Sequence, residues 1–317
     1  MRKKEEKSVM TAKLANREQS LGLRILRCWQ LYVLILPAFA YIIIFHYIPM
    51  YGIVIAFQDY NPAAGFFGKF VGFKHFTTFI QSMQFEKLIL NTLLLNVYSL
   101  IFTFPLPILL ALLLNEARHA WFKKAVQNIT YIPLFISTVV VVGMLNCFLA
   151  PSNGIVNVLI EKLGGQSVDF MGQAKWFRTL YIVSGVWQNC GSSAIIFIAA
   201  LSGIDPELHE AAQIDGANRL QRIWHINLPG IMPTIVMLLI LNCGSLLNVG
   251  MDKVYLMQNT MNLSVSEVIS TYVYKVGLLT AQYSYSTAIG LFNAVINFMI
   301  LFAVDRFAKK ASGISLF

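Results

Sequence analysis

Six long apolar segments constrain what this chain can fold into more than any other feature of its sequence. Each is close to the roughly 20 apolar residues that an α-helix needs to cross a lipid bilayer. The chain is 57% hydrophobic and only 12% charged, whereas about a quarter of the residues in a soluble domain are charged. The segments are 31–57, 88–114, 128–149, 180–201, 231–250 and 286–304. The sequence therefore predicts an all-α membrane protein with six transmembrane helices.

Prolines interrupt several of these segments. Proline lacks a backbone N–H, and the carbonyl that it frees must be satisfied by a neighbouring helix or a cavity. Pro229 and Pro233 are expected to mark the entry into the fifth segment. The prolines inside the first three segments are Pro37, Pro49, Pro105, Pro107 and Pro133.

Basic residues are unequally divided between the two sides of the predicted membrane. One set of loops holds sixteen Lys and Arg residues and the opposite set holds eight. The richer set comprises 1–27, 115–126, 202–230 and 305–317, and the poorer set comprises 58–87, 150–179 and 252–284. Because cytoplasmic loops carry the excess of Lys and Arg, we expect both termini and the loop 202–230 to be cytosolic. The net charge of +9 follows from this bias and does not indicate nucleic-acid binding.

The loop between the fourth and fifth segments is predicted to form a helical hairpin outside the lipid. Asp205 can accept hydrogen bonds from the free N–H groups of a helix start, and Pro206 has no N–H to leave unsatisfied. This first helix should run to Ile214, and Gly216 should end it through a left-handed turn. A second helical run over 217–226 follows. Such a polar hairpin is expected to dock on a partner.

The order of residues in this hairpin is more specific than its predicted helices. The triplet Glu210-Ala211-Ala212 is followed by three residues and Gly216, and nine residues later by Ile226-x-Leu228-Pro229. This order resembles the EAA signature of permease subunits in binding-protein-dependent ABC importers. The two alanines leave a narrow surface, Glu210 offers an anion, and glycine permits a sharp bend. The resemblance assigns ATPase coupling to Glu210, Ala211, Ala212, Asp215, Gly216, Ile226, Leu228 and Pro229.

The resemblance implies a type I ABC importer permease fold in a bacterial cytoplasmic membrane, with 202–230 as the coupling-helix loop. Its implied partners are a second homologous permease, most simply a different chain, a dimer of ATP-binding subunits, an extracytoplasmic solute-binding protein, a saccharide and the lipid bilayer. ATP and Mg would be bound by the ATPase subunits. The expected parts are a cytosolic tail (1–30), a first helix with its outer loop (31–87), the transmembrane core (88–307) and a second tail (308–317). Residues 18–30 form either an interfacial helix or a simple flexible tail.

Residues outside the hairpin carry a second, narrower resemblance. They are similar to permeases that handle complex oligosaccharides and polysaccharides, a branch that includes the permeases of the alginate importer. An acidic polysaccharide is therefore one candidate cargo. The residues concerned are 47–73, Asn91-Thr92-Leu93 and Tyr131-Ile132-Pro133.

Amide and aromatic side chains within two segments suit a sugar, because sugar hydroxyls need donors and acceptors and the C–H face of a sugar stacks on aromatic rings. The alternative is that these amides join helix to helix, as polar residues commonly do in membrane bundles. Both interpretations stay open. The candidate pathway residues are Trp187, Gln188, Asn189, Asn242 and Asn248.

Motifs for catalysis by the chain itself are missing from the sequence. It has no G-x-x-x-x-G-K-[ST] phosphate loop. The five histidines have no metal-ligand spacing, and the four cysteines are expected to fill apolar space. The rival functions are an ion-coupled secondary sugar transporter, which needs carboxylates within the membrane, and a membrane-embedded enzyme such as a sugar transferase. The predicted segments contain no carboxylate, and the acids of the outer loops are scattered.

Overall fold

The computed structural model describes residues 29–65, 68–313 and 315. Within it the chain divides into two units, 1–54 and 55–317. The predicted tail over 1–30, with its alternative interfacial helix, lies almost entirely outside the described residues, as does Cys28.

The described part of the first unit is one long apolar helix that continues to Phe57, for 29 residues in all. It confirms the predicted segment 31–57. A π-helical turn comes just before Pro49, whose ring cannot donate into a regular helix. The successive elements are α3 (Trp29–Ile42), the π-turn (Ile43–Tyr47), α4 (Ile48–Met50) and a 3-10 helix (Tyr51–Phe57).

The second unit is built from helices, with one short antiparallel pair of strands. The strands are β1 (Gln58–Asp59) and β2 (Lys69–Phe70). The helices are α5 (Lys74–Ile80), α6 (Phe85–Thr103), α7 (Pro105–Asn115), α8 (Ala120–Tyr131), α9 (Thr138–Phe148), α10 (Ile155–Lys162), α11 (Ala174–Ser202), α12 (Pro206–Ile214), α13 (Arg219–Arg222), α14 (Leu228–Cys243), α15 (Met251–Met257), α16 (Leu263–Ser266), α17 (Ile269–Tyr274) and α18 (Tyr283–Ser312). Shorter 3-10 or π-helical pieces cover Pro62–Ala64, Ile132–Phe135, Ile223–Asn227 and Lys275–Leu279.

Five helices of the described chain are long and apolar enough to cross a bilayer, and a sixth span exists if the bent pair α8–α9 is counted as one. The mostly helical fold with these spans agrees with the prediction. The helix of the sixth predicted segment, α18, continues past the predicted end at residue 304 and so includes Asp305, which is buried. The expectation that no span contains a carboxylate was therefore wrong at this helix end, and also at the start of the span Phe85–Asn115, which includes Glu86. The straight spans are Trp29–Phe57, Phe85–Asn115, Ala174–Ser202, Arg219–Cys243 and Tyr283–Lys310.

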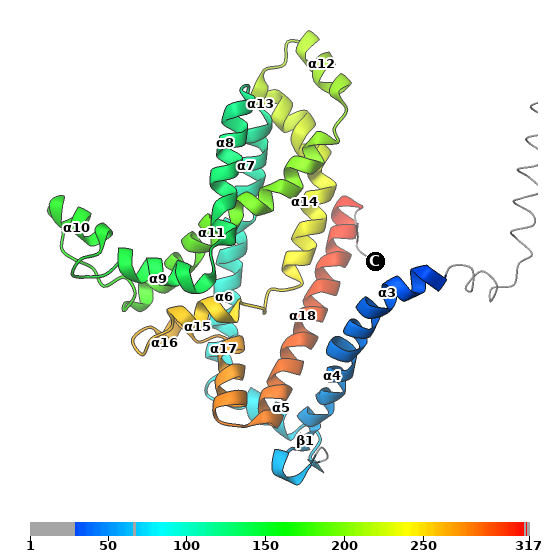
Figure 1. The fold of residues 1–317 in the computed structure, drawn as a ribbon, viewed down its shortest axis with the longest axis vertical. Helices are drawn as coiled ribbons and strands as arrows, with labels where there is room; N and C mark the ends of the chain where they lie inside the picture. The colour runs from blue at the N-terminus through cyan, green and yellow to red at the C-terminus, as the bar shows by residue number, and fades with distance from the viewer. Residues whose placement is uncertain (1–28, 66–67, 314, 316–317) are drawn as a thin grey trace, which may run out of the picture. The chain divides into compact units, whose positions relative to one another are not determined.

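The third predicted segment, 128–149, is not a straight helix. The chain bends by 100° between the end of α8 and the start of α9, and α9 and α10 turn away from α8 (Figure 1). Pro133 lies in the 3-10 turn at the bend, where it cannot donate a hydrogen bond, and Ser137 restarts the helix as a side-chain cap. The Gln188 side-chain amide donates to the carbonyl of Ile136 at 2.8 Å. A neighbouring helix thus satisfies a carbonyl that the break leaves open.

The fifth predicted segment, 231–250, begins and ends too late. The second arm of the hairpin and the fifth span form one helix, Arg219–Cys243, that contains a π-turn. Pro229 comes two residues after the π-turn, and such a local adjustment accommodates the missing N–H, so the proline does not break the helix. The chain leaves the helix at Gly244 and stays irregular up to α15.

Helix α11 is the packing centre of the second unit, and α6, α7, α8, α14, α15 and α16 all contact it. Figure 1 shows α11 running between α7 and α8 on one side and α14 on the other. One buried cluster joins α7, α11 and α14 next to the hairpin, and a second joins α6, α11 and α15 farther away. The first comprises Ala111, Leu112, Ala194, Phe197, Leu201 and Ile231, and the second includes Leu95, Phe177, Val254 and Met257.

Close packing of α8 on α11 depends on Gly191. A Cβ at this position would lie well inside van der Waals contact with the backbone carbonyl of Thr130 on α8. We expect Gly191→Ala to destabilise the protein by about 1–3 kcal/mol, because the backbone must move to admit the methyl group. Gly143→Ala on α9 is the matched control, since nothing lies within 4 Å of its Cβ position.

The control should be neutral or slightly stabilising, as alanine usually is in a helix. Thermal unfolding of the two detergent-solubilised variants, followed by intrinsic fluorescence, measures the difference. Equal midpoints for Gly191→Ala and Gly143→Ala would show that the α8–α11 contact is loosely packed.

Candidate functional site

The first arm of the hairpin is built as its sequence predicts. The Asp205 carboxylate accepts from the Glu207 N–H at 3.0 Å, and Pro206 occupies the first helical position. At the other end Gly216 has a φ of +79°, the left-handed conformation. Its N–H donates to the carbonyl of Gln213, and the next N–H donates to the carbonyl of Ala212. This pair of bonds is a Schellman motif, which satisfies the last carbonyls of the helix and reverses the chain.

The second arm starts with its own cap. Asn218 accepts from the backbone N–H of Gln221, and the side chain of Gln221 accepts from the backbone N–H of Asn218, which forms a capping box. The predicted second helix over 217–226 is therefore shorter as a regular α-helix than expected. It begins at Arg219 and passes into the π-turn Ile223–Asn227.

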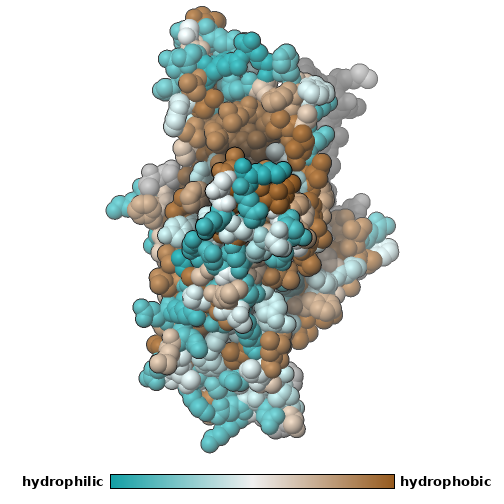
Figure 2. Space-filling view, turned by 90° about the vertical axis from the view of Figure 1, so that its left-hand side faces the viewer, coloured by the Kyte–Doolittle hydropathy of each residue, from teal (hydrophilic) through white to brown (hydrophobic). Residues whose placement is uncertain are grey.

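The hairpin exposes apolar side chains although it is otherwise polar. Figure 2 shows that hydrophilic residues cover the end of the unit that carries the hairpin, with hydrophobic residues directly below. None of the α12 residues is buried. The largest exposed apolar side chains here are Leu208, Ile214, Leu220 and Trp224, which are 53–87% exposed. These four side chains are thus accessible for contact with another protein.

The structure brings the predicted coupling residues to one end of the unit. Ala212, Asp215, Gly216 and Ile226 line a cavity of about 330 Å³ between the two arms. Glu210 lines a neighbouring cavity of about 500 Å³. Of the remaining members of this set, Ala211 and Pro229 are exposed and Leu228 is half-buried in the first cluster.

An ion pair holds the second arm to the end of α7. Glu116, which follows α7 directly, lies 3.5 Å from the Arg222 guanidinium, and both side chains are about 15% exposed. Its other carboxylate oxygen accepts from the side-chain amide of Asn227 at 3.3 Å. Asn227 is fully buried in the π-turn. Sequence reasoning missed these contacts of Glu116, because they join distant parts of the chain; Glu116 and Asn227 are 111 positions apart.

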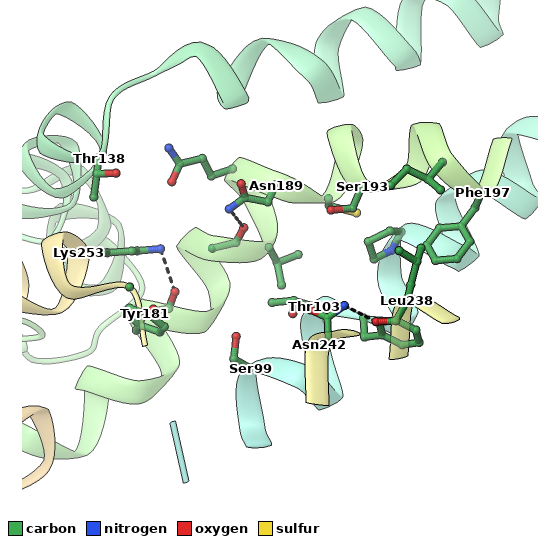
Figure 3. A pocket seen from close by; sticks show the side chains of 18 residues that line it. Ser99, Thr103, Thr138, Tyr181, Asn189, Ser193, Phe197, Leu238, Asn242 and Lys253 are labelled. Carbon is green, nitrogen blue, oxygen red and sulfur yellow. Dashed lines mark hydrogen bonds between the residues drawn. The ribbon is translucent and has the colours of Figure 1, made fainter. Parts of the chain in front are cut away.

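A polar cavity of about 490 Å³ lies between α6, α11, α14 and α15 (Figure 3). Three of the five predicted pathway residues line it: Gln188, Asn189 and Asn242. The other two, Trp187 and Asn248, do not line it; Trp187 is 45% exposed, and Asn248 lies after the end of the fifth helix rather than within it. Hydroxyl groups complete the polar lining, from Ser99, Thr103, Thr138 and Ser193.

Lys253 on α15 is the ionised group of this cavity that sequence reasoning did not single out. Its ammonium donates to the backbone carbonyl of Tyr181 at 3.0 Å and lies 4.9 Å from the centre of the Tyr181 ring. Burial lowers the pKa of Lys253 to about 8. The sequence signal was its place just after the fifth apolar segment, where it was counted only as an outer-loop charge.

Within the described residues, no group of three or more His, Cys, Asp or Glu side chains is arranged to hold a metal ion. The cavity lining offers amide and hydroxyl groups that can hydrogen-bond a polyhydroxylated ligand, and the hairpin presents exposed apolar side chains.

Known proteins resemble this chain along nearly its whole length. It is 46% identical over 295 residues to YteP of Bacillus subtilis (strain 168), a polygalacturonan/rhamnogalacturonan transport system permease protein, covering 93% of this chain and 92% of that one. It is 44% identical to the protein LplB of the same bacterium over 288 residues, 90% of this chain and 91% of that protein.

Solved structures show a similarity that also extends over nearly the whole chain. The chain superposes with a TM-score of 0.85 and 41% identity on a chain of a bacterial ABC transporter involved in the import of the acidic polysaccharide alginate, covering 93% of this chain and 100% of that one. The TM-score is 0.86 for a chain of the alginate transporter in complex with an alginate pentasaccharide-bound periplasmic protein, covering 94% of this chain and 100% of that one. Residues 104–313 match the family described as "Binding-protein-dependent transport system inner membrane component". The resemblance seen in the EAA-like hairpin is thereby confirmed, and this chain belongs to the family of binding-protein-dependent transport system inner membrane components.

Proposed function

We propose that this chain is the permease subunit of an ATP-driven importer that moves an oligo- or polysaccharide through the cytoplasmic membrane by alternating access. One structural observation carries the proposal. The second arm of the hairpin and the fifth span form a single helix, Arg219–Cys243, and Asn242 near its far end lines the polar cavity. A displacement of the hairpin therefore reaches the cavity through one continuous element.

The hairpin is the proposed contact with the ATPase subunits, which bind ATP and Mg themselves. Its exposed apolar side chains would be covered in a cleft of the ATPase, and Glu210, Ala211 and Asp215 are accessible for contacts at its polar surface. The excess of Lys and Arg on the hairpin side supports a cytosolic position for this loop and for both termini.

Two further partners complete the assembly. A lone set of five or six spans supplies only part of a passage, which favours a second, homologous permease chain as its other wall. On the opposite face a solute-binding protein would deliver the saccharide, as the pentasaccharide-bound periplasmic protein accompanies the alginate transporter. Closure of the ATPase dimer would then bias a two-state change between inward and outward access.

The experiment that tests this proposal is purification of the chain together with its co-expressed partners, followed by reconstitution into liposomes. We expect ATP-dependent saccharide uptake, and ATP hydrolysis stimulated by the loaded binding protein. Uptake that persists without the ATPase subunits but collapses with an uncoupler would identify an ion-coupled transporter instead. Turnover of a saccharide by the purified chain alone would identify an enzyme.

A further inference from the structure

The polar cavity has a positively charged side chain in its lining and no negatively charged one. Among the residues that line it, Lys253 is the cation, and no Asp or Glu takes part. No carboxylate of the described residues lies within 4.0 Å of its ammonium, since every such pair in this part of the chain involves another base. An ammonium group has three donors. The one hydrogen bond to the Tyr181 carbonyl leaves donors for a ligand.

The surroundings of Lys253 leave its ammonium accessible from the cavity. The side chain extends from α15 toward α11, where its nitrogen meets the Tyr181 carbonyl (Figure 3). Gly185 lies one turn farther along α11, and a Cβ there would already stand 3.4 Å from the ammonium. The absence of a side chain at this position thus keeps one approach to the charge free.

The three amides of the cavity complement this cation. The side-chain NH₂ group of each amide donates a hydrogen bond to a backbone carbonyl: Gln188 to Ile136, Asn189 to Gly185 and Asn242 to Leu238, at 2.8, 3.1 and 2.7 Å. Their amide oxygens remain as acceptors, which suit the hydroxyl groups of a sugar. A carboxylate, in contrast, needs donors, and a charged donor forms the stronger hydrogen bond.

We propose that Lys253 binds the carboxylate of a uronic acid unit in this cavity and sets the preference of the permease for acidic over neutral saccharides. The inference rests on the proposed function and names its substrate class. It agrees with two relatives that are named for polygalacturonan/rhamnogalacturonan and alginate transport. The polar cavity supplies hydroxyl recognition, and Lys253 supplies charge recognition.

The test measures equilibrium binding to the assembled complex in lipid nanodiscs, without the binding protein. The probes are a galacturonate oligosaccharide with free carboxylates and its fully methyl-esterified form. We expect the wild-type complex to bind the free acid about tenfold more tightly, a factor that corresponds to about 1.4 kcal/mol. Lys253→Gln should abolish this preference, and Lys253→Arg should retain it. Lys162→Gln at the exposed end of α10 is the control and should behave as wild type.

The glutamine variant separates charge from packing, because its amide can still donate to the Tyr181 carbonyl. Lys253→Met removes both the donor and the charge. A purely structural lysine would leave the preference intact in Lys253→Gln, and this result would overturn the inference. An absent preference in the wild-type complex would overturn it too. Uptake of the free acid into proteoliposomes, measured separately, reports on the proposed function and remains interpretable if the Lys253 assignment fails.

Discussion

Replacing Gly216 by valine is expected to lower saccharide-stimulated ATP hydrolysis of the assembled importer at least about tenfold, while membrane insertion and subunit assembly persist. The reason is conformational. Gly216 has a φ of +79°, which a β-branched residue adopts only at a cost of about 1–3 kcal/mol. The Schellman bonds to the carbonyls of Ala212 and Gln213 depend on this turn. An exposed hairpin can relieve the strain by changing the angle between its arms, and its coupling surface changes with it.

A matched control exists on the same chain. Gly164 has a φ of +84°, and nothing lies within 4 Å of its Cβ position, as is also true of Gly216. Gly164→Val therefore introduces a similar strain after α10, away from the hairpin, and should retain stimulated hydrolysis. Gly216→Asn should retain most of it as well, because asparagine tolerates the left-handed region. Full stimulation in Gly216→Val, measured with purified complex and loaded binding protein, would refute the coupling assignment.

The second large effect is expected for Glu116→Leu. This change leaves the Arg222 guanidinium and the Asn227 amide without the carboxylate that both contact. Because both sites are largely buried, the loss should cost about 1–3 kcal/mol. We expect the second arm to detach from the end of α7, and stimulated ATP hydrolysis to fall by about tenfold. Glu116→Gln should be milder, since its oxygen can still accept from Asn227.

Glu161→Leu controls for the loss of a negative charge, because Glu161 is exposed on α10. The informative quantity is the ratio of substrate-stimulated to basal hydrolysis, which a general loss of protein does not change. If Glu116→Leu keeps this ratio at the wild-type value, the ion pair is only a structural tie between α7 and the hairpin.

Local signals explain why much of the fold was predictable from sequence. The spans follow from the length of apolar segments, and the first hairpin helix follows from Asp205, Pro206 and Gly216, each of which acts on its immediate neighbours. Errors arose where an outcome depended on distant partners. Pro133 follows the end of a regular helix in the third segment, whereas Pro229 lies inside a continuous helix, just after a π-turn. The two prolines differ in what precedes and packs against them.

The residues of the candidate site also differ in whether they could be predicted from local sequence. The residues predicted to couple to an ATPase all fall within the short stretch 210–229, so the hairpin could be predicted from sequence. Lys253 and Glu116 belong to loops in the sequence and gain their roles only when α15 and the end of α7 are brought to α11 and the π-turn. Likewise Trp187 stands between Val186 and Gln188 in the sequence, and both of these line the cavity, whereas Trp187 is 45% exposed and does not.

The single helix from Arg219 to Cys243 has a consequence for how such a chain can vary. Adding one residue between Pro233 and Asn242 would leave the hairpin sequence and its caps unchanged, yet would rotate everything beyond the insertion by about 100°. Asn242 would then swing out of the cavity wall. The number of residues in this helix is thus constrained as well as the identity of its side chains. Natural insertions and deletions should avoid the helix even where individual side chains vary freely.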